Sequence, residues 1–198
     1  MVLPQDPTTR FYAENASTYA EHANAPSRER LDPFLARLTQ GARILELGCG
    51  NGRDSAEMLS RGFRVTPTDG IAEIAAEASR RLKMPVSVLP FSEITAVSAF
   101  DGIWANACLL HVPRVDLGAV LSRIHRALRQ GGVFYASFKG GEAEGHDALG
   151  RYYNYPSMPW LMMLGETLPW SYLAVDMTHG GAYDGQPTDW LHLLAVKA

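Results

Sequence analysis

Residues 44–54 read Ile44-Leu45-Glu46-Leu47-Gly48-Cys49-Gly50-Asn51-Gly52-Arg53-Asp54, and this stretch decides the fold of the chain. Its apolar beginning has the length and composition of a buried parallel strand. The three glycines that follow let the backbone turn tightly and approach a ligand, because they carry no Cβ atom. The helix expected next would present free N–H groups to that ligand. The stretch therefore predicts a strand, a glycine turn and a helix that together bind a nucleotide-type cofactor.

The spacing of the glycines indicates which cofactor this is. A dinucleotide fingerprint, G-x-G-x-x-G, that began at Gly48 would need a glycine where Arg53 stands, and one that began at Gly50 would end on Ser55. The pattern present is E-x-G-x-G-x-G, from Glu46 to Gly52. It resembles motif I of the class I S-adenosylmethionine (SAM)-dependent methyltransferases. Two other readings stay open, an NAD(P)-dependent oxidoreductase and a non-catalytic SAM-binding or regulatory protein.

Strands and helices alternate between residues 42 and 138. Short apolar runs predict strands at 43–47, 63–68, 86–89, 100–106 and 132–138. Helical periodicity predicts helices at 55–61, 71–83 and 116–129, with Gly131 and Gly132 ending the last of them. This order predicts an α/β fold, in which helices cover both faces of a Rossmann-like, doubly wound sheet.

Further segments flank this core on both sides. Residues 9–21 and 27–38 are predicted helices, and a glycine-rich loop at 140–150 precedes an aromatic stretch at 152–170. Residues 171–177 and 189–197 are predicted to pair as an antiparallel hairpin. We divide the predicted single domain of residues 1–198 into an N-terminal helical lid (1–40), a SAM-binding core (42–138), a substrate-side insertion (139–170) and a C-terminal hairpin (171–198).

The region of the fourth strand extends the resemblance. Residues 100–113, FDGIWANACLLHVP, resemble motif IV in a subgroup of small bacterial methyltransferases that includes tellurite-resistance proteins. Residues 128–139, 150–153 and 190–192 continue the pattern, although His192 stands where the subgroup has asparagine. The resemblance implies a seven-stranded sheet in the order 3-2-1-4-5-7-6, with strand 7 antiparallel, and the transfer of a methyl group from SAM with release of S-adenosylhomocysteine (SAH).

Cofactor residues are expected at the carboxyl ends of the strands. Asp69 ends the second strand, and its carboxylate can accept both ribose hydroxyls, although capping the helix that follows is an alternative role. Phe91 is the expected adenine contact, with core packing as the alternative. The complete set of predicted cofactor residues is Tyr19, Glu46, Gly48, Cys49, Gly50, Asp69, Gly70, Phe91, Asn106, Ala107 and His111.

Catalysis depends on a smaller number of candidate residues. Asn106 and Ala107 are expected beneath the methionine part of SAM, near its reactive sulfonium. His111 is the candidate catalytic residue, because an imidazole titrates near neutral pH and could take a proton from a thiol, amine or hydroxyl. The alternative for His111 is to line the pocket or bind backbone. In-line methyl transfer needs alignment above all, so a general base is optional.

Substrate residues are expected in the lid and after the fifth strand. Tyr12 and Tyr19 could cover the cofactor, because aromatic faces attract its sulfonium, although packing of their helix explains the same spacing. Lys139 and Arg151 would suit an anionic group of the substrate, with exposed loop charge as the alternative. The complete set of predicted substrate residues is Tyr12, Lys139, Arg151 and Tyr152.

Composition narrows the class of partner. The chain has 198 residues, 46% of them hydrophobic, and a formal net charge of -3, so it lacks the basic footprint of most nucleic-acid-binding proteins. We therefore expect a small-molecule substrate, although tRNA or protein as the methyl acceptor stays open. Neither a membrane-spanning run nor a signal peptide is apparent, so we expect a cytoplasmic protein, as a monomer or homodimer. The two cysteines and the histidines show no metal-ligand spacing, and no metal is expected.

Overall fold

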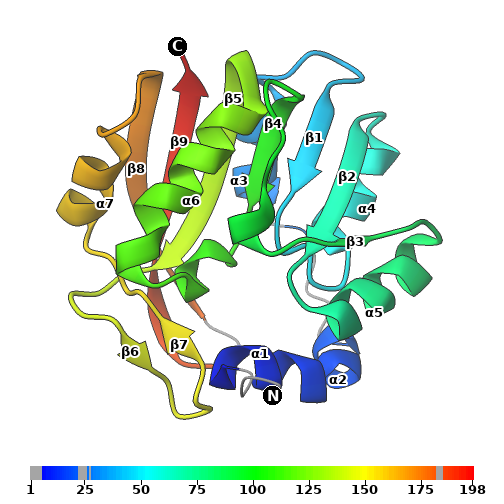
Figure 1. The fold of residues 1–198 in the computed structure, drawn as a ribbon, viewed down its shortest axis with the longest axis vertical. Helices are drawn as coiled ribbons and strands as arrows, with labels where there is room; N and C mark the ends of the chain where they lie inside the picture. The colour runs from blue at the N-terminus through cyan, green and yellow to red at the C-terminus, as the bar shows by residue number, and fades with distance from the viewer. Residues whose placement is uncertain (1–5, 22–25, 27, 182–184) are drawn as a thin grey trace.

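The computed structural model describes residues 6–21, 26, 28–181 and 185–198. Within them, one mixed sheet has the strand order β3-β2-β1-β4-β5-β9-β8, which confirms the predicted order (Figure 1). Pairs from β3 to β5 are parallel, and β9 runs antiparallel to both of its neighbours. The strands are β1 (Arg43–Glu46), β2 (Arg64–Asp69), β3 (Ser87–Val88), β4 (Phe100–Ala105), β5 (Leu128–Lys139), β8 (Trp170–Gly181) and β9 (Pro187–Lys197).

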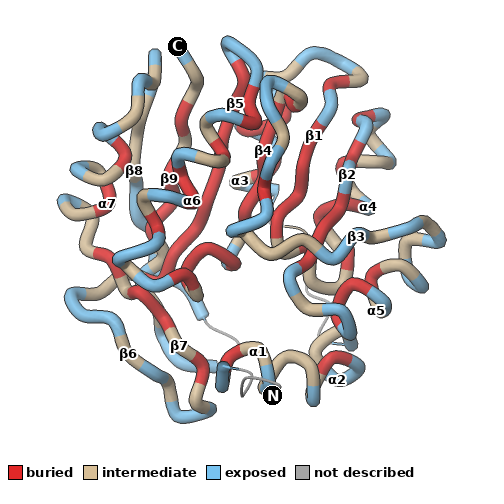
Figure 2. Tube along the Cα trace, in the orientation of Figure 1, coloured by how far each residue is buried: buried red, intermediate tan, exposed pale blue. Residues whose placement is uncertain are grey.

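Both faces of the sheet are buried against helices (Figures 1 and 2). Helices α3 (Arg28–Leu35) and α4 (Arg53–Ser60) pack on one face, and α6 (Arg114–Ala127) and α7 (Met158–Gly165) pack on the other. Successive strand residues point to opposite faces, so Ile103 joins the α6 side of the core while Trp104 joins the α3 side. Helix α5 (Ala72–Leu82) packs beside β2 and β3. This two-sided burial explains the continuous apolar runs of the central strands.

The N-terminal helices lie across the carboxyl ends of the parallel strands (Figure 1). The prediction of one helix over residues 9–21 is wrong, because α1 (Pro7–Glu14) and α2 (Ala16–Glu21) are separated at Asn15. Asn15 is the C-cap of α1, with φ -110° and ψ 15°, and its side chain and backbone N–H both donate to the carbonyl of Phe11, at 2.8 and 3.1 Å. Asp6 caps α1 by accepting from the backbone of Thr8 and Thr9.

Two further segments differ from prediction. Helix α6 ends at Ala127, before the glycine pair, and β5 begins at Leu128. Gly131 instead lies within β5 with φ +73°, where the register against β4 shifts, so the glycines allow an irregularity in the strand. The insertion holds a small hairpin of β6 (Gly145–His146) and β7 (Tyr152–Tyr153) in addition to α7.

The other segment boundaries agree with prediction to within a few residues. The short strand β3 covers only half of its predicted range, and the terminal hairpin extends further toward its turn. Two residues of predicted segments lie outside the described residues, namely Ser27 of the second predicted helix and Asp184 of the turn between the two hairpin strands. Every helix in the described part of the chain is too short or too polar to cross a membrane.

The glycine turn brings the ends of β1 and β4 into contact. A Cβ atom added at Gly48, where φ is +60°, would lie 2.4 Å from the Cβ of Cys108. The backbone N–H of Cys49 donates to the carbonyl of Thr68 at 2.9 Å, which ties the turn to β2 as well. The turn therefore fixes three neighbouring strand ends relative to one another.

Alanine at Gly48 and at Gly131 gives a matched pair of variants that tests this contact. Both glycines have positive φ, where an alanine costs about 1–2 kcal/mol. A Cβ at Gly131 would meet nothing within 4 Å, whereas a Cβ at Gly48 collides with Cys108. We expect Gly48→Ala to lower the free energy of unfolding in urea by about 2 kcal/mol more than Gly131→Ala. Equal losses would contradict the close approach.

Candidate active site

A cavity of about 280 Å³ lies between the lid helices and the carboxyl ends of the central strands. Cavities of about 300 Å³ and larger hold small molecules, so this one approaches that range. Most of the predicted cofactor residues line it, namely Tyr19, Gly48, Gly50, Asp69, Gly70, Phe91, Ala107 and His111, and so does Tyr12. The sequence pattern and the topology therefore bring these residues to one place.

Asp69 holds a buried carboxylate at the end of β2. Its two oxygens accept from the backbone N–H groups of Gly50, at 3.1 Å, and Ile71, at 3.0 Å. Burial raises the pKa of Asp69 to about 6, although these backbone bonds oppose the rise. The N-cap of α5 is Ile71, so the capping alternative for Asp69 is wrong. The carboxylate instead fixes the glycine turn and faces the cavity.

Three predicted cofactor residues lie outside the cavity lining. Glu46 is buried beneath the turn and bonds to the hydroxyl of Ser55, and burial raises its pKa well above the usual value. Cys49 is also buried. Asn106 donates to Asp54 at 3.1 Å and accepts from the Ser137 hydroxyl at 2.7 Å, so its side-chain polar groups are used within the protein. These residues support the wall of the cavity.

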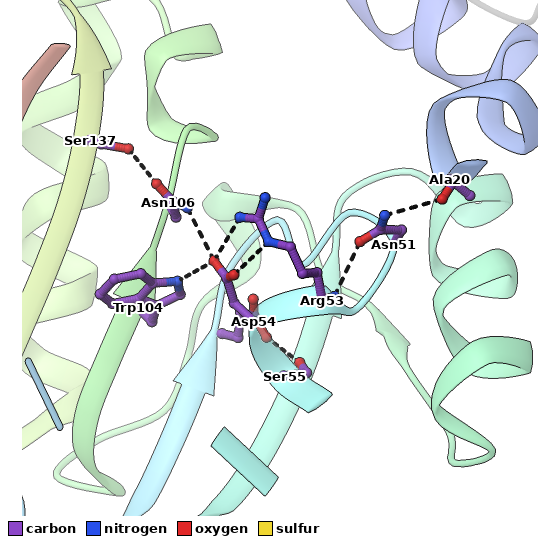
Figure 3. A network of polar contacts seen from close by, with 9 residues as sticks. Ala20, Asn51, Arg53, Asp54, Ser55, Trp104, Asn106 and Ser137 are labelled. Atoms are coloured by element: carbon purple, nitrogen blue, oxygen red, sulfur yellow. Dashed lines mark hydrogen bonds and ion pairs between the residues drawn. The ribbon is translucent and has the colours of Figure 1, made fainter. Parts of the chain in front are cut away.

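Asp54 is the centre of the polar network beneath the cavity (Figure 3). Its side chain is buried and accepts from Trp104 Nε1 at 3.0 Å and from Asn106 Nδ2 at 3.1 Å. Arg53 donates to the same carboxylate at 2.7 Å. Asp54 lies in the first turn of α4, and Trp104 and Asn106 belong to β4 and its end, so this carboxylate joins the two elements.

The turn is also joined to the lid. The Asn51 side chain donates to the carbonyl of Ala20 in α2 at 3.1 Å and accepts from the backbone of Arg53 (Figure 3). The ring of Tyr19 lies 3.5 Å from the position that a Cβ on Gly50 would take. Tyr12 and Tyr19 meet edge to face at 5.2 Å between centroids. The lid thus covers the glycine turn with aromatic rings.

His111 faces the lid from η2 (Leu109–His111), the short helix after β4. Its Nδ1 lies 2.6 Å from the carbonyl oxygen of Tyr152, which can only accept, so Nδ1 carries the proton. Its Nε2 then accepts from the Tyr12 hydroxyl at 3.0 Å. Burial lowers the pKa of His111 to about 4, so the imidazole is neutral at pH 7. This geometry leaves a proton-accepting nitrogen at the edge of the cavity.

The predicted substrate residues do not lie together, and each has a different environment. Arg151 is buried, and its Nε and Nη2 both donate to Asp147 Oδ2, at 2.9 and 2.7 Å. Its guanidinium also lies over the ring of Phe11, so the exposed alternative is wrong for it and its charge is already paired within the protein. The hydroxyl of Tyr152 donates to Glu144 at 2.5 Å, away from the cavity, because the side chain points to the β6 loop. Lys139 is only 6% exposed, so exposed loop charge is wrong for it too.

Several residues of the site were missed by sequence reasoning. Asp54 and Trp104 form the network beneath the turn, but their contact joins positions that are 50 residues apart. Cys108 and Pro90, which line the cavity, each adjoin a predicted site residue or strand end. Asp6 and Thr9 also line the cavity. A local signal could have found them, because an Asp followed by Pro7 marks the start of a helix, which places both residues in the first turn of the lid. Among the described residues, no group of His, Cys, Asp and Glu is arranged to hold a metal ion.

Comparison with known proteins finds methyltransferases that are similar to this chain. Residues 44–132 match the family model described as a methyltransferase domain. A malonyl-[acyl-carrier protein] O-methyltransferase from Enterobacter lignolyticus is 32% identical over 131 residues, which are 62% of this chain and 49% of that protein. A trans-aconitate 2-methyltransferase from Variovorax paradoxus is 36% identical over 58% of this chain and 44% of its own length. The chain thus spans about half the length of the curated relatives it matches.

A solved structure agrees over a greater share of the chain. The 1,6-didemethyltoxoflavin-N1-methyltransferase of Burkholderia thailandensis, which was crystallised with its substrate and SAH, has a TM-score of 0.73 and 26% identity. The match covers 100% of this chain and 92% of that one. Residues 44–132 thus match a methyltransferase domain, and the fold of the whole chain resembles that of a methyltransferase that was crystallised with SAH.

Proposed function

We propose that the protein transfers the methyl group of SAM to a small-molecule acceptor. The observation that carries the proposal is the position of Asp69 beside the glycine turn, in a cavity that aromatic lid residues cover. A buried carboxylate there suits the two ribose hydroxyls, and Gly48 and Gly50 line the cavity without a side chain. The residues present therefore fit SAM.

Each part of the cavity suits a part of the cofactor. Phe91 and Ile71 offer apolar contacts for the adenine, and Asp69 holds the ribose. Tyr12 and Tyr19 present aromatic rings to the sulfonium, where each contact contributes about 0.5–2 kcal/mol. When bound, SAM supplies a methyl group that the positive sulfur makes electrophilic. The chain itself must align the acceptor and exclude water.

His111 is the residue we propose to receive the proton of the acceptor. The neutral Nε2 of His111 accepts from the Tyr12 hydroxyl, and both residues line the cavity, so the proton of the acceptor passes to the Tyr12 oxygen as the Tyr12 proton passes to Nε2. A pKa of about 4 makes this imidazole a weak base. A weak base is sufficient, because an oxygen acceptor becomes strongly acidic as its bond to the methyl carbon forms.

The names of the similar proteins give both oxygen and nitrogen as the atom that is methylated, and some of them name a small molecule. One relative is named as an O-methyltransferase, and another acts on trans-aconitate, a small molecule. The net charge of -3 is consistent with this, because proteins that bind nucleic acid usually carry excess positive charge. The proposal therefore covers small acceptors and leaves the tellurite-resistance subgroup without support beyond sequence resemblance.

Ligand binding to Asp69 variants tests the proposal directly. We expect calorimetry to show that SAM and SAH bind and that NAD does not. Asp69→Asn should weaken SAH binding at least tenfold, because it loses the charge that accepts the ribose hydroxyls. Asp116→Asn, at an exposed position in α6, is the control and should bind as the wild type does. Binding of NAD in preference to SAH, or full affinity in Asp69→Asn, would overturn the proposal.

The affinity for SAH should also depend on pH through Asp69. The ionised carboxylate is the form that accepts the ribose hydroxyls, and its pKa in the free protein is about 6. We therefore expect constant affinity above pH 7 and a fall below pH 6 that approaches tenfold per pH unit, which Asp69→Asn should lack.

The contribution of Asp69 to the free energy of unfolding of the unliganded protein should depend on pH in the opposite sense to the SAH affinity. Because folding raises the pKa of Asp69 from 3.8 to about 6, this group favours folding below pH 3.8, and the contribution is lost as the pH rises through 6. The difference in unfolding free energy between the wild type and Asp69→Asn, measured as a function of pH, separates the contribution of Asp69 from that of other titrating groups. A pH-independent difference, together with pH-independent SAH affinity, would contradict the assigned ionisation.

The bond between Tyr12 and His111 should hold the lid closed over the ligand. Tyr12→Phe removes the hydroxyl that donates to His111 and accepts from Arg151 at 3.4 Å. Loss of the His111 bond alone, worth about 1 kcal/mol, should let SAH dissociate about fivefold faster. Stopped-flow measurement of SAH release checks this. Tyr172→Phe, on the partly exposed edge strand β8, is the matched control and should leave the rate unchanged. Unchanged release in Tyr12→Phe would show that the lid is held by other contacts.

A further inference from the structure

One residue of the cofactor cavity has a strained backbone. Ala107, in the turn after β4, has φ +53°, a left-handed conformation that is unfavourable for a residue with a Cβ atom. Of the non-glycine residues with positive φ in the described part of the chain, Ala107 alone lines this cavity. Such strain persists only where the surrounding structure fixes the backbone, and it is concentrated at functional sites. The contacts on either side of Ala107 identify what fixes it.

On its C-terminal side, Ala107 is followed by Cys108, which is fixed against the glycine turn. The Cys108 thiol donates to the carbonyl of Leu47 at 3.1 Å, and the Cβ of Cys108 leaves no room for a side chain on Gly48. Gly48, Ala107 and Cys108 all line the cavity. The turn after β4 therefore rests on the turn after β1, and together they form one wall of the cavity.

On its N-terminal side, Ala107 is fixed by Ser137 of β5. The backbone N–H of Ala107 donates to the Ser137 hydroxyl at 2.8 Å. That hydroxyl donates to Asn106 Oδ1 at 2.7 Å, and the Asn106 amide donates to the carboxylate of Asp54 at 3.1 Å (Figure 3). A backbone N–H only donates and a carboxylate only accepts, so the directions of these bonds are fixed. The Ser137 hydroxyl must therefore accept one bond and donate the other.

These two contacts together define the strained torsion angle. Ser137 fixes the backbone N–H of Ala107, the bond to Leu47 fixes Cys108, and φ of Ala107 is a rotation between them. Ser137 is 1% exposed and lies outside the cavity lining, so it acts on a ligand only through Ala107. Without its hydroxyl, the N–H loses this partner and the backbone of Ala107 is free to rotate toward the negative φ that alanine prefers. The wall of the cavity would then change shape.

We propose that Ser137 is a positioning residue of the cofactor site, which holds Ala107 in its left-handed conformation and so keeps the cavity wall in the shape that SAM requires. The inference rests on the proposed function, because SAM is the ligand whose sulfonium we expect beside Ala107. Its physical basis is preorganisation, since the strain is met when the protein folds and cofactor binding does not have to order this turn. Ser137 itself takes no part in the transfer of the methyl group.

Rescue by a glycine tests this inference, because glycine adopts positive φ without strain. In calorimetry, Ser137→Ala should weaken SAH binding about tenfold, which corresponds to about 1.4 kcal/mol of strain. Adding Ala107→Gly to Ser137→Ala should restore the affinity to within about threefold of the wild type. Adding Lys83→Gly instead should restore nothing, although Lys83, at the exposed end of α5, has φ +54°. A role of Ser137 in stability alone would not be corrected by Ala107→Gly and left uncorrected by Lys83→Gly.

Thermal unfolding tests the strain separately from ligand binding. In the wild-type background, Ala107→Gly and Lys83→Gly should each raise the midpoint of unfolding by about 3 °C, because each relieves one positive φ. If Ser137→Ala fails to fold, Ser137→Cys takes its place in the same set of variants, because a thiol fills the site but forms only weak hydrogen bonds.

Three results would overturn the inference. The first is a folded Ser137→Ala or Ser137→Cys that binds SAH as the wild type does. The second is a loss of binding that Ala107→Gly does not restore, or that Lys83→Gly restores equally well. The third is a midpoint of unfolding that Ala107→Gly does not raise. Failure of the wild type to bind SAH would instead contradict the proposed function.

Discussion

The carboxylate of Asp54 is the interaction on which the arrangement of this site depends. It gathers N–H donors from Arg53, Trp104 and Asn106 at the junction of α4 and β4. Each of these donors would lose a partner if the carboxylate were absent, at a cost of about 1–3 kcal/mol per buried group. The same network positions Asn106 against Ser137 of β5. The glycine turn and the ends of three strands are therefore held in one relative position before any ligand binds.

Burial acts on the two titratable groups of the cavity in opposite directions. It raises the pKa of Asp69 to about 6 and lowers that of His111 to about 4, because the neutral form of each is favoured away from water. At neutral pH the result is a negative carboxylate beside a neutral imidazole. A cationic cofactor stabilises the first and disfavours protonation of the second. The site is thus prepared for a positive ligand and for a proton acceptor at the same time.

The sequence determined those features that depend on local pattern. The strands, the glycine turn and the position of Asp69 follow from apolar runs, spacing and strand ends, and the strand order is what the family resemblance implies; the structure has them as predicted. Features that depend on distant partners could not be predicted. Asn106 is turned to Asp54, 52 residues away, rather than to the cavity. Arg151 is paired with Asp147, which is close in sequence but lies in a loop that no periodicity describes. The lid helix is also divided at its Asn15 C-cap, where propensity alone favours a continuous helix.

A crystal structure with SAH tests the central claim most directly, namely that the cavity beneath the lid holds the cofactor. The account predicts the ribose hydroxyls within hydrogen-bond distance of the Asp69 carboxylate and the sulfur beside Ala107 and His111. Tyr12 and Tyr19 should cover it from the lid. SAH bound elsewhere, or bound in this cavity with its ribose away from Asp69, would contradict the account.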